Sequence, residues 1–296
     1  MNSQNRRAPR LRRSWCFLPG AEREVLLSAR TSGADVLIQE LEDFTPPERR
    51  AGARAISREV LSVWKSVGIL AAVRINALDG DGLADLAAVM PAAPDIVLLP
   101  KVTTAEQMLE LERSVCRLER DAGLPLGATE LVPNIESGLG LVNAQEILSA
   151  SPRITAGLVG GEDMAADLGA ERTRGGAELA YVRARFLVEV RAAGIVAIDM
   201  PYTWTDAKGC EADAWEARRS GYTAKAAVSA EHCVIINRVL TPSRGEAAQA
   251  RRIVEAFETA RSRGSGRVLL DGSLVELPNY LTAKRLYERA SAFGVV

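Results

Sequence analysis

Short apolar runs alternate with longer amphipathic stretches along most of the chain, and this alternation constrains the fold more than any other feature. Each run has the length of a buried strand, and the stretches between them repeat with the period of a helix. The predicted strands cover residues 14–17, 36–39, 70–73, 95–99, 130–133, 154–159, 195–198 and 224–228. Eight strand–helix repeats in about 230 residues predict an α/β fold, a (β/α)₈ TIM barrel. A doubly wound open sheet is the alternative, but no glycine-rich phosphate motif follows the first strand.

Both ends of the chain fall outside this repeat. Residues 1–13 contain five arginines and lead into no apolar segment. This pattern predicts a disordered basic tail, with a transit peptide or an anion-binding arm as the alternatives. Residues 14–242 form the predicted barrel. Residues 243–296 form a C-terminal extension of two helices and two short strands, which we expect to pack on the barrel and to contribute to a subunit interface.

The composition argues against several classes of protein. The net charge of −1 creates no overall field that would draw the chain to nucleic acid or to an anionic membrane. Its apolar runs fall short of the roughly 18 residues that a membrane-spanning helix needs. The four cysteines lack the spacing of a zinc site, and with no secretory signal ahead of them we expect reduced thiols in the cytoplasm.

The chain contains a single histidine, His232. A serine–histidine–aspartate arrangement therefore has one candidate base, and no motif marks it. A metal site would have to use oxygen ligands, which favours Mg²⁺, with Mn²⁺ as the alternative.

Charged side chains stand just beyond the ends of five successive predicted strands. The carboxyl ends of barrel strands converge on one mouth, where ligands bind. In chain order the charged residues are Glu42, Asp43, Arg74, Lys101, Glu136, Glu162 and Asp163. Grouped carboxylates repel one another unless a cation neutralises them. The pattern predicts a divalent metal held by two carboxylates, with Arg74 binding an anionic substrate.

Each of these residues also has a structural interpretation. The two acidic pairs are suited to capping the helices that follow them. Arg74 and Lys101 are suited to ion pairs that balance nearby acids. Glu136 has no obvious capping role, because Ser137 and Asn143 are available for it.

Seven segments, in order, resemble the citrate lyase beta-subunit-like enzymes of the HpcH/HpaI aldolase superfamily, which include malyl-CoA and citramalyl-CoA lyases. The segments are RRSWCFLPG, SGADVLIQELED, AVRINALD, DIVLLPKV, NIESGLGLVNAQEI, LVGGEDMAADLGA and YVRARFLVEVRAAGIVAID. The resemblance implies a barrel that assembles into homotrimers or hexamers. It also implies a Mg²⁺-dependent carbon–carbon lyase acting on a small-molecule 3-hydroxyacyl-CoA such as citryl-, malyl- or citramalyl-CoA.

The matching motifs imply a role for each residue at the mouth. Glu136 and Asp163 would bind Mg²⁺, and Glu136 would also lie against the substrate. Glu42 and Asp43 would hold water on the metal. Arg74 would clamp the carboxylate or carbonyl end of the substrate. In acyl-CoA members a C-terminal aspartate from a neighbouring subunit completes the site.

The sequence departs from the family pattern at four places. Glu276 stands where that aspartate would be, which lengthens the arm by one methylene group. The segment after Lys225 lacks the histidine that often follows the strand-8 lysine. Phe44 adds bulk beside the acidic pair, and Asn134 replaces an apolar residue near the metal. These departures leave the metal ligands unchanged and bear on the identity of the substrate.

The mechanism expected from these residues is cleavage without a covalent intermediate. Mg²⁺ and Arg74 stabilise charge on the oxo acid, and Glu276 protonates the enolate carbon. Lys101 as a Schiff-base lysine is the weaker alternative, since that role requires a lowered pKa. Three other functions stay open: a CoA-independent aldolase of hydroxy-oxo acids, a malyl-CoA thioesterase, and a non-catalytic subunit that docks a partner.

Overall fold

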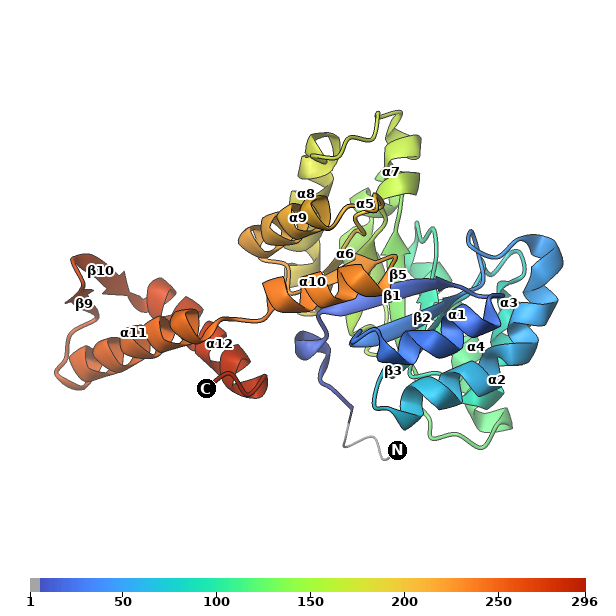
Figure 1. Cartoon of the computed structure of the whole chain (residues 1–296), viewed down its shortest axis with the longest axis horizontal. Helices are drawn as coiled ribbons and strands as arrows, with labels where there is room; N and C mark the ends of the chain where they lie inside the picture. Colours follow the sequence, from blue (N-terminus) through green and yellow to red (C-terminus); the bar gives the residue numbers. More distant parts are fainter. Residues whose placement is uncertain (1–5) are drawn as a thin grey trace. The chain divides into compact units, whose positions relative to one another are not determined.

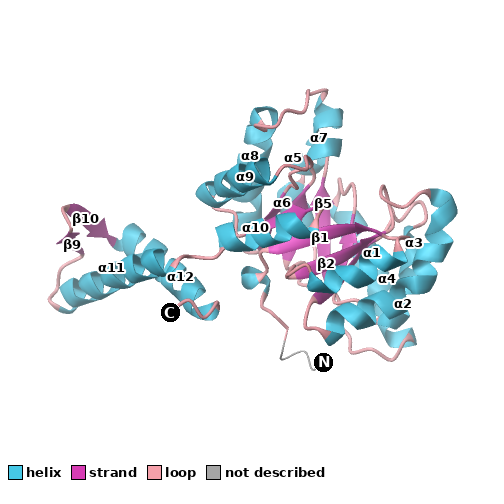
Figure 2. Ribbon diagram, viewed as in Figure 1, coloured by secondary structure: helices cyan, strands magenta, loops and turns pink. Residues whose placement is uncertain are grey.

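Eight parallel strands close into a barrel in the computed structural model, which describes residues 6–296 (Figures 1 and 2). The strands are β1 (Ser14–Pro19), β2 (Val36–Glu40), β3 (Leu70–Arg74), β4 (Ile96–Leu99), β5 (Glu130–Ile135), β6 (Ala156–Val159), β7 (Val196–Asp199) and β8 (Ala224–Ala227). They pair in chain order, and β8 returns to β1. The predicted (β/α)₈ TIM barrel is confirmed.

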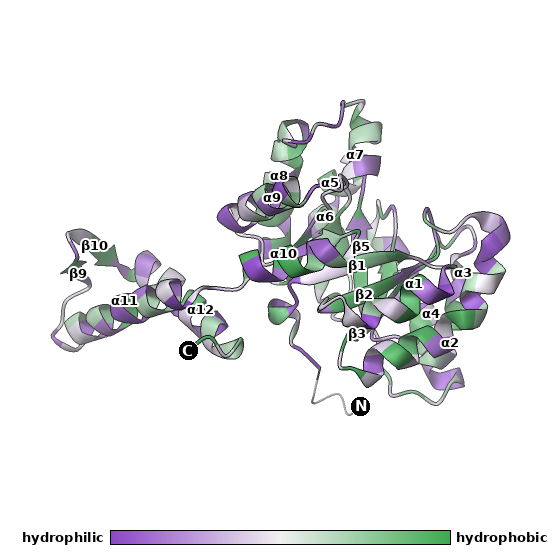
Figure 3. Cartoon of the chain, in the orientation of Figure 1, coloured by the Kyte–Doolittle hydropathy of each residue, from purple (hydrophilic) through white to green (hydrophobic). Residues whose placement is uncertain are grey.

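Helices cover the outside of the barrel. They are α1 (Arg23–Ser28), α2 (Arg50–Ser66), α3 (Gly82–Val89), α4 (Ala105–Asp121), α5 (Gly138–Val142), α6 (Ala144–Leu148), α7 (Gly161–Leu168), α8 (Ala180–Ala192), α9 (Ala207–Ser220) and α10 (Ala230–Leu240). Short 3₁₀ turns η2 (Pro9–Leu11), η3 (Ala29–Thr31), η4 (Pro47–Arg49), η5 (Met90–Ala92) and η6 (Ala177–Leu179) join or extend them. Hydrophilic and hydrophobic residues alternate along these helices, as amphipathic packing requires (Figure 3).

Two short helices follow β5 in place of one longer helix. The first, α5, begins at Gly138, and α6 follows it after Asn143. The Ser137 hydroxyl caps α5 by accepting from the backbone N–H of Gly140 at 3.1 Å. A Cβ atom on Gly140 would lie 2.5 Å from the carbonyl oxygen of Val102, so only glycine lets the chain turn this close to its neighbour.

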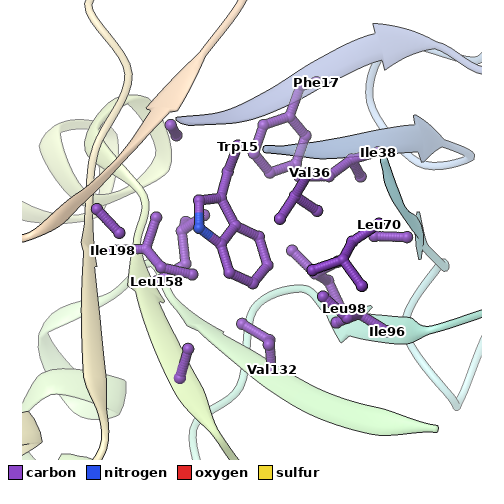
Figure 4. Close-up of a cluster of buried hydrophobic side chains, with 14 residues drawn as sticks. Trp15, Phe17, Val36, Ile38, Leu70, Ile96, Leu98, Val132, Leu158 and Ile198 are labelled. Carbon is purple, nitrogen blue, oxygen red and sulfur yellow. The ribbon is translucent and has the colours of Figure 1, made fainter. Parts of the chain in front are cut away.

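Alternating side chains fill the barrel interior. Trp15 lies in the middle of this cluster, between Leu158 and Val36 (Figure 4). Ile38 and Leu98 also belong to the cluster, and both are fully buried. Because side chains on a strand point to opposite faces in turn, the residues of the same parity nearer the carboxyl ends also point inward. The barrel therefore has an apolar core beneath its mouth.

The segment before β1 is ordered where the structure describes it. Arg12 is 1% exposed and donates two hydrogen bonds to the Glu130 carboxylate, at 2.6 and 2.7 Å. Arg13 pairs with Asp35, which directly precedes β2. The prediction of a disordered tail is therefore wrong for residues 6–13, because these arginines neutralise carboxylates at the amino ends of the strands. The first five residues lie outside the described part of the chain.

Residues Val239–Val296 form a second compact unit. It contains α11 (Arg244–Ser262), β9 (Arg267–Leu270), β10 (Ser273–Glu276) and α12 (Leu277–Ala292). The two strands form an antiparallel hairpin. Phe257 on α11 stacks on Tyr280 of α12, with ring centroids 4.8 Å apart, and Val275 of the hairpin completes this small core. In residues 6–296 no helix has the length and apolar character needed to span a membrane.

Candidate active site and metal centre

Arg74 is at the centre of a charged cluster at the carboxyl ends of the strands. It is the last residue of β3 and is 6% exposed. Its guanidinium contacts four carboxylates, three of them from the end of β2 and the loop that follows it, and one from the residue after β5. The nearest oxygens belong to Glu40 at 3.0 Å, Glu42 at 3.3 Å, Glu136 at 3.5 Å and Asp43 at 3.7 Å. Glu42, Asp43 and Glu136, three of the residues predicted to converge, therefore meet around one arginine.

Lys101 lies two residues after the end of β4 and belongs to the same cluster. Its Nζ lies 2.5 Å from Glu42, 3.3 Å from Asp43 and 4.0 Å from Asp163. Its backbone N–H donates to the Glu136 carboxylate at 2.8 Å, from a left-handed conformation with φ of 52°. Burial lowers the pKa of Lys101, but the hydrogen bond and charge of Glu42 outweigh it, so the pKa is raised. A protonated lysine is a poor Schiff-base nucleophile.

Glu136 and Asp163 supply the two carboxylates expected to bind a metal. Glu136 follows β5 and is 4% exposed, whereas Asp163 lies in the first turn of α7 and is more open. Burial raises the pKa of Glu136, and the negative charge of Asp163 raises it further, against the opposing charge of Arg74. A Cβ atom on Gly160 would lie 2.5 Å from the Glu136 side chain, so glycine at the end of β6 makes room for this carboxylate.

The pKa of Glu42 also reflects an excess of negative charge in the cluster. Burial is the main reason that its pKa is raised to about 7, and the charges of Asp43 and Glu136 add to the effect. Arg74 and Lys101 oppose the shift without cancelling it. One of the Glu42 oxygens, Oε2, has no hydrogen-bond partner among the described residues. The two basic side chains therefore do not neutralise the cluster fully.

The donor set fits a hard divalent cation. Five carboxylates surround two cationic side chains, and oxygen ligands suit Mg²⁺ or Mn²⁺. Across the described chain, no three His, Cys, Asp or Glu side chains form a ready-made cage. Mg²⁺ commonly takes one or two protein carboxylates and keeps water as its other ligands, so Glu136 and Asp163 would be enough to hold it.

Glu40 is a site residue that the sequence prediction missed. It is the last residue of β2 and is fully buried. Its carboxylate accepts the backbone N–H groups of Glu42 and Phe44, both at 2.6 Å, and the Nε–H of Arg74 at 3.0 Å. The predicted strand, residues 36–39, stops one residue short of Glu40. The alternation of Val36, Ile38 and Glu40 was the signal that places it inside the barrel.

Glu162 lies apart from the central cluster. Its carboxylate accepts from Arg172 at 3.2 Å and from the Thr203 hydroxyl at 2.9 Å. The Arg172 guanidinium also lies over the Trp204 ring, 5.2 Å from its centroid. Glu162 therefore ties together the loops that follow β6 and β7, and the structure places only Asp163 of this pair at Lys101.

Glu276 ends β10 in the second unit, where it is exposed. Its carboxylate caps α12, and its backbone N–H donates to the Asn279 side chain at 3.0 Å. Its predicted role in a barrel of a neighbouring copy stays a prediction.

Two further residues singled out from the sequence, Lys225 and His232, are both buried in the barrel unit. Lys225 on β8 is fully buried and pairs with Asp199 at 2.6 Å and Asp213 at 2.5 Å. His232 on α10 is buried, and burial lowers its pKa. Its ring lies 6.1 Å from that of Tyr202.

Comparisons with known proteins agree with this geometry. The family model described as HpcH/HpaI aldolase/citrate lyase matches residues 13–230. The citrate lyase subunit beta of Leuconostoc mesenteroides subsp. cremoris is 34% identical over 97% of this chain and 96% of its own length. A (3S)-malyl-CoA thioesterase of Cereibacter sphaeroides is 31% identical over 95% of each. The solved structure of CitE from Mycobacterium tuberculosis in complex with magnesium, acetoacetate and coenzyme A has a TM-score of 0.77 and 27% identity, covering 95% of this chain and 99% of that one. The chain therefore belongs to the HpcH/HpaI aldolase/citrate lyase family.

Proposed function

We propose that this protein is a Mg²⁺-dependent carbon–carbon lyase that cleaves a 3-hydroxyacyl-CoA such as citryl-, malyl- or citramalyl-CoA. The observation that carries the proposal is the incompletely neutralised carboxylate cluster around Arg74, with Glu136 and Asp163 at its edge. The citrate lyase subunits among its relatives support the lyase reaction. The magnesium in the related CitE structure supports the choice of metal.

Each residue of the cluster has a role in the proposed reaction. Glu136 and Asp163 hold Mg²⁺, which when bound supplies Lewis-acid stabilisation of charge on the oxo acid. Arg74 donates from its planar guanidinium to the carboxylate or carbonyl oxygens of the substrate. Glu42 and Asp43, themselves held by Arg74 and Lys101, orient water at the site.

Proton transfer falls to Glu276 of a neighbouring copy. When the carbon–carbon bond breaks, a carboxylate of the cluster around Arg74 takes the hydroxyl proton, and the hydroxyl-bearing carbon becomes the carbonyl of the oxo acid. The electron pair of the broken bond stays with the acyl-CoA fragment as an enolate. The enolate carbon then takes a proton from the Glu276 carboxyl group, which removes that proton again in the condensation direction. The exposed position of Glu276 at the end of β10 supports a role toward another copy.

The proposal is tested by incubating the purified protein with citryl-, malyl- and citramalyl-CoA and following oxo acid release. Mg²⁺-supported release that EDTA abolishes is the expected result for one of the three esters. Glu136→Gln and Asp163→Asn should remove this activity. Glu59→Gln is the matched control, because Glu59 makes an exposed ion pair with Arg23. Mg²⁺ binding without any turnover would contradict the lyase and favour a subunit that docks a partner.

Thioester hydrolysis is the second candidate, because a (3S)-malyl-CoA thioesterase is 31% identical over nearly the whole chain. The two reactions differ in their products. Hydrolysis of malyl-CoA yields free malate and CoA, whereas cleavage of the carbon–carbon bond yields an oxo acid and an acyl-CoA. The same incubation distinguishes them when malate, CoA and oxo acid are quantified together.

A further inference from the structure

A buried amide lies beneath the charged cluster. Asn134 on β5 is 0% exposed, and neither its Oδ1 nor its Nδ2 has a hydrogen-bond partner in the part of the chain that the structure describes. Its register partner on β6 is Leu158, which belongs to the interior cluster together with Val132. Since side chains two residues apart share a face, Val132, Asn134 and Glu136 all point into the barrel.

The strand register places Asn134 at the level of Arg74. Residues at one height in an eight-stranded barrel of this type are offset by one position per strand, and alternate strands contribute to one layer. Following the pairing from Phe17 on β1 leads in this way to Arg74 on β3 and Asn134 on β5. The Arg74 guanidinium lies 5.1 Å from the Phe17 ring centroid, as expected for one layer. Asn134 therefore forms part of the floor directly below Glu136.

An amide is costly at this position unless something binds to it. Leaving a buried polar group unpaired destabilises the folded protein, and such groups in native proteins call for an explanation. Leucine has the same number and branching of side-chain heavy atoms and would pack beside Leu158 and Val132 without that cost. The amide, two residues before Glu136, thus points to a ligand group that enters from the mouth.

The chemistry of an amide selects the kind of group. Oδ1 only accepts and Nδ2 only donates, and a hydroxyl can pair with both at once. A carboxylate would satisfy Nδ2 alone, and it would be repelled by Oδ1 and by the carboxylates of Glu136 and Glu40 nearby. An alkyl group would leave both amide atoms unpaired.

We propose that Asn134 is a specificity residue that binds a hydroxyl group on the oxo-acid portion of the substrate. The preferred substrate is then a hydroxyacyl thioester, or a free hydroxy-oxo acid, whose cleavage releases a 2-oxo acid with a hydroxyl on carbon 3. The oxo acids released from citryl-, malyl- and citramalyl-CoA lack that hydroxyl, so these esters would be poorer substrates of the same reaction. The assignment rests on the proposed function, because it takes the oxo acid to be bound at the cluster above Asn134.

The test compares two oxo acids of equal length, 3-hydroxypyruvate and 2-oxobutanoate. The first carries a hydroxyl group where the second carries a methyl group. Their dissociation constants are measured by calorimetry with saturating Mg²⁺ and no CoA ester. The wild-type protein should bind 3-hydroxypyruvate about tenfold or more tightly. Asn134→Leu should abolish or reverse this preference, while its Mg²⁺ affinity stays unchanged and its thermal midpoint is unchanged or higher. Asn134→Val serves as a second variant if the leucine variant does not fold.

Several outcomes would overturn the assignment. A wild-type protein without the preference would do so, and so would an equal preference in both proteins, which would leave the amide a partner for buried water only. Binding of neither oxo acid would overturn the assignment, whereas the incubation with the CoA esters decides the proposed lyase separately. A preference lost in Asn134→Leu, in a protein that cleaves none of the three CoA esters, would uphold the assignment and reject only those substrates.

Discussion

At the scale of single residues, the site depends on one guanidinium shared among several acids. Arg74 contacts four carboxylates, and Glu40 is the one among them whose side chain is completely buried. Glu40 also accepts two backbone N–H groups of the loop that carries Glu42 and Asp43. It therefore fixes both the direction of Arg74 and the position of the acidic pair, without itself being one of the groups expected to touch substrate.

The Glu40→Gln variant tests this supporting role. Glutamine keeps the size of the side chain, but its amide nitrogen must face a backbone N–H or the Arg74 guanidinium, so Arg74 and the loop should shift. Displacements of about 1 Å can reduce kcat/KM by ~10²-fold, and we expect a loss of that order in oxo acid release. Glu59→Gln should retain full activity. A Glu40→Gln enzyme with wild-type kcat/KM and wild-type Mg²⁺ affinity would contradict the role.

The positions of charged residues just after the predicted strands indicated which side chains would gather at the mouth of the barrel. Local geometry explains the one residue that does not join them. Glu42, Asp43, Lys101, Glu136 and Asp163 meet as the pattern indicated. Successive residues on a helix point about 100° apart, so Glu162 and Asp163 cannot both face the mouth. The missing amide partners of Asn134 depend on its neighbours in space, which a single sequence does not give.

At the scale of elements, the segment before β1 closes the amino-terminal end of the barrel. The bidentate pair between Arg12 and Glu130 joins residues that are far apart in the chain. A run of arginines without apolar neighbours resembles a solvated tail, because the acids that neutralise it lie at the starts of distant strands. The alternation of apolar and amphipathic stretches is local, which is why the barrel was predictable and this contact was not.

Removing Arg12 should destabilise the barrel. Arg12→Met leaves the Glu130 carboxylate largely buried without its partner, and breaking such a pair costs about 3 kcal/mol. The double variant Arg12→Met, Glu130→Met replaces the pair by apolar groups and should recover most of that loss. Urea unfolding of the two single variants, the double variant and the wild type gives the coupling free energy. A coupling close to zero would mean that the pair contributes nothing to stability.

The same pair predicts a pH dependence. Burial raises the pKa of Glu130, but the hydrogen bonds and charge of Arg12 outweigh it, so the pKa in the folded protein is below its usual value of 4.5. A lowered folded-state pKa contributes stability that is present above pH 4.5 and lost as the pH falls through the folded-state value. The difference in unfolding free energy between wild type and Arg12→Met should therefore shrink below pH 4.5. A difference independent of pH down to acid unfolding would contradict this explanation.

At the scale of the whole molecule, the second unit exposes several large apolar side chains, whose contact with water is unfavourable. Leu269 and Leu274 pair in register on the outer face of the hairpin, and they are 70% and 51% exposed. Leu277 and Leu281 at the start of α12 are also exposed. Burying such a patch against another copy of the chain would stabilise an oligomer. This face supports the proposal that the C-terminal extension contributes to a subunit interface.

A site shared between copies can be tested by complementation. Glu136→Gln removes a proposed metal ligand from the barrel, and Glu276→Ala removes the proposed proton donor from the second unit, so each variant alone should be inactive. In a randomly mixed oligomer, some intact barrels meet an intact Glu276 from a neighbour, and about a quarter of wild-type activity should return on co-expression. If Glu276 served the barrel of its own chain, every site would carry one defect and mixing would restore nothing. An active Glu276→Ala variant would instead remove this residue from the mechanism and leave the metal cluster to act with another acid.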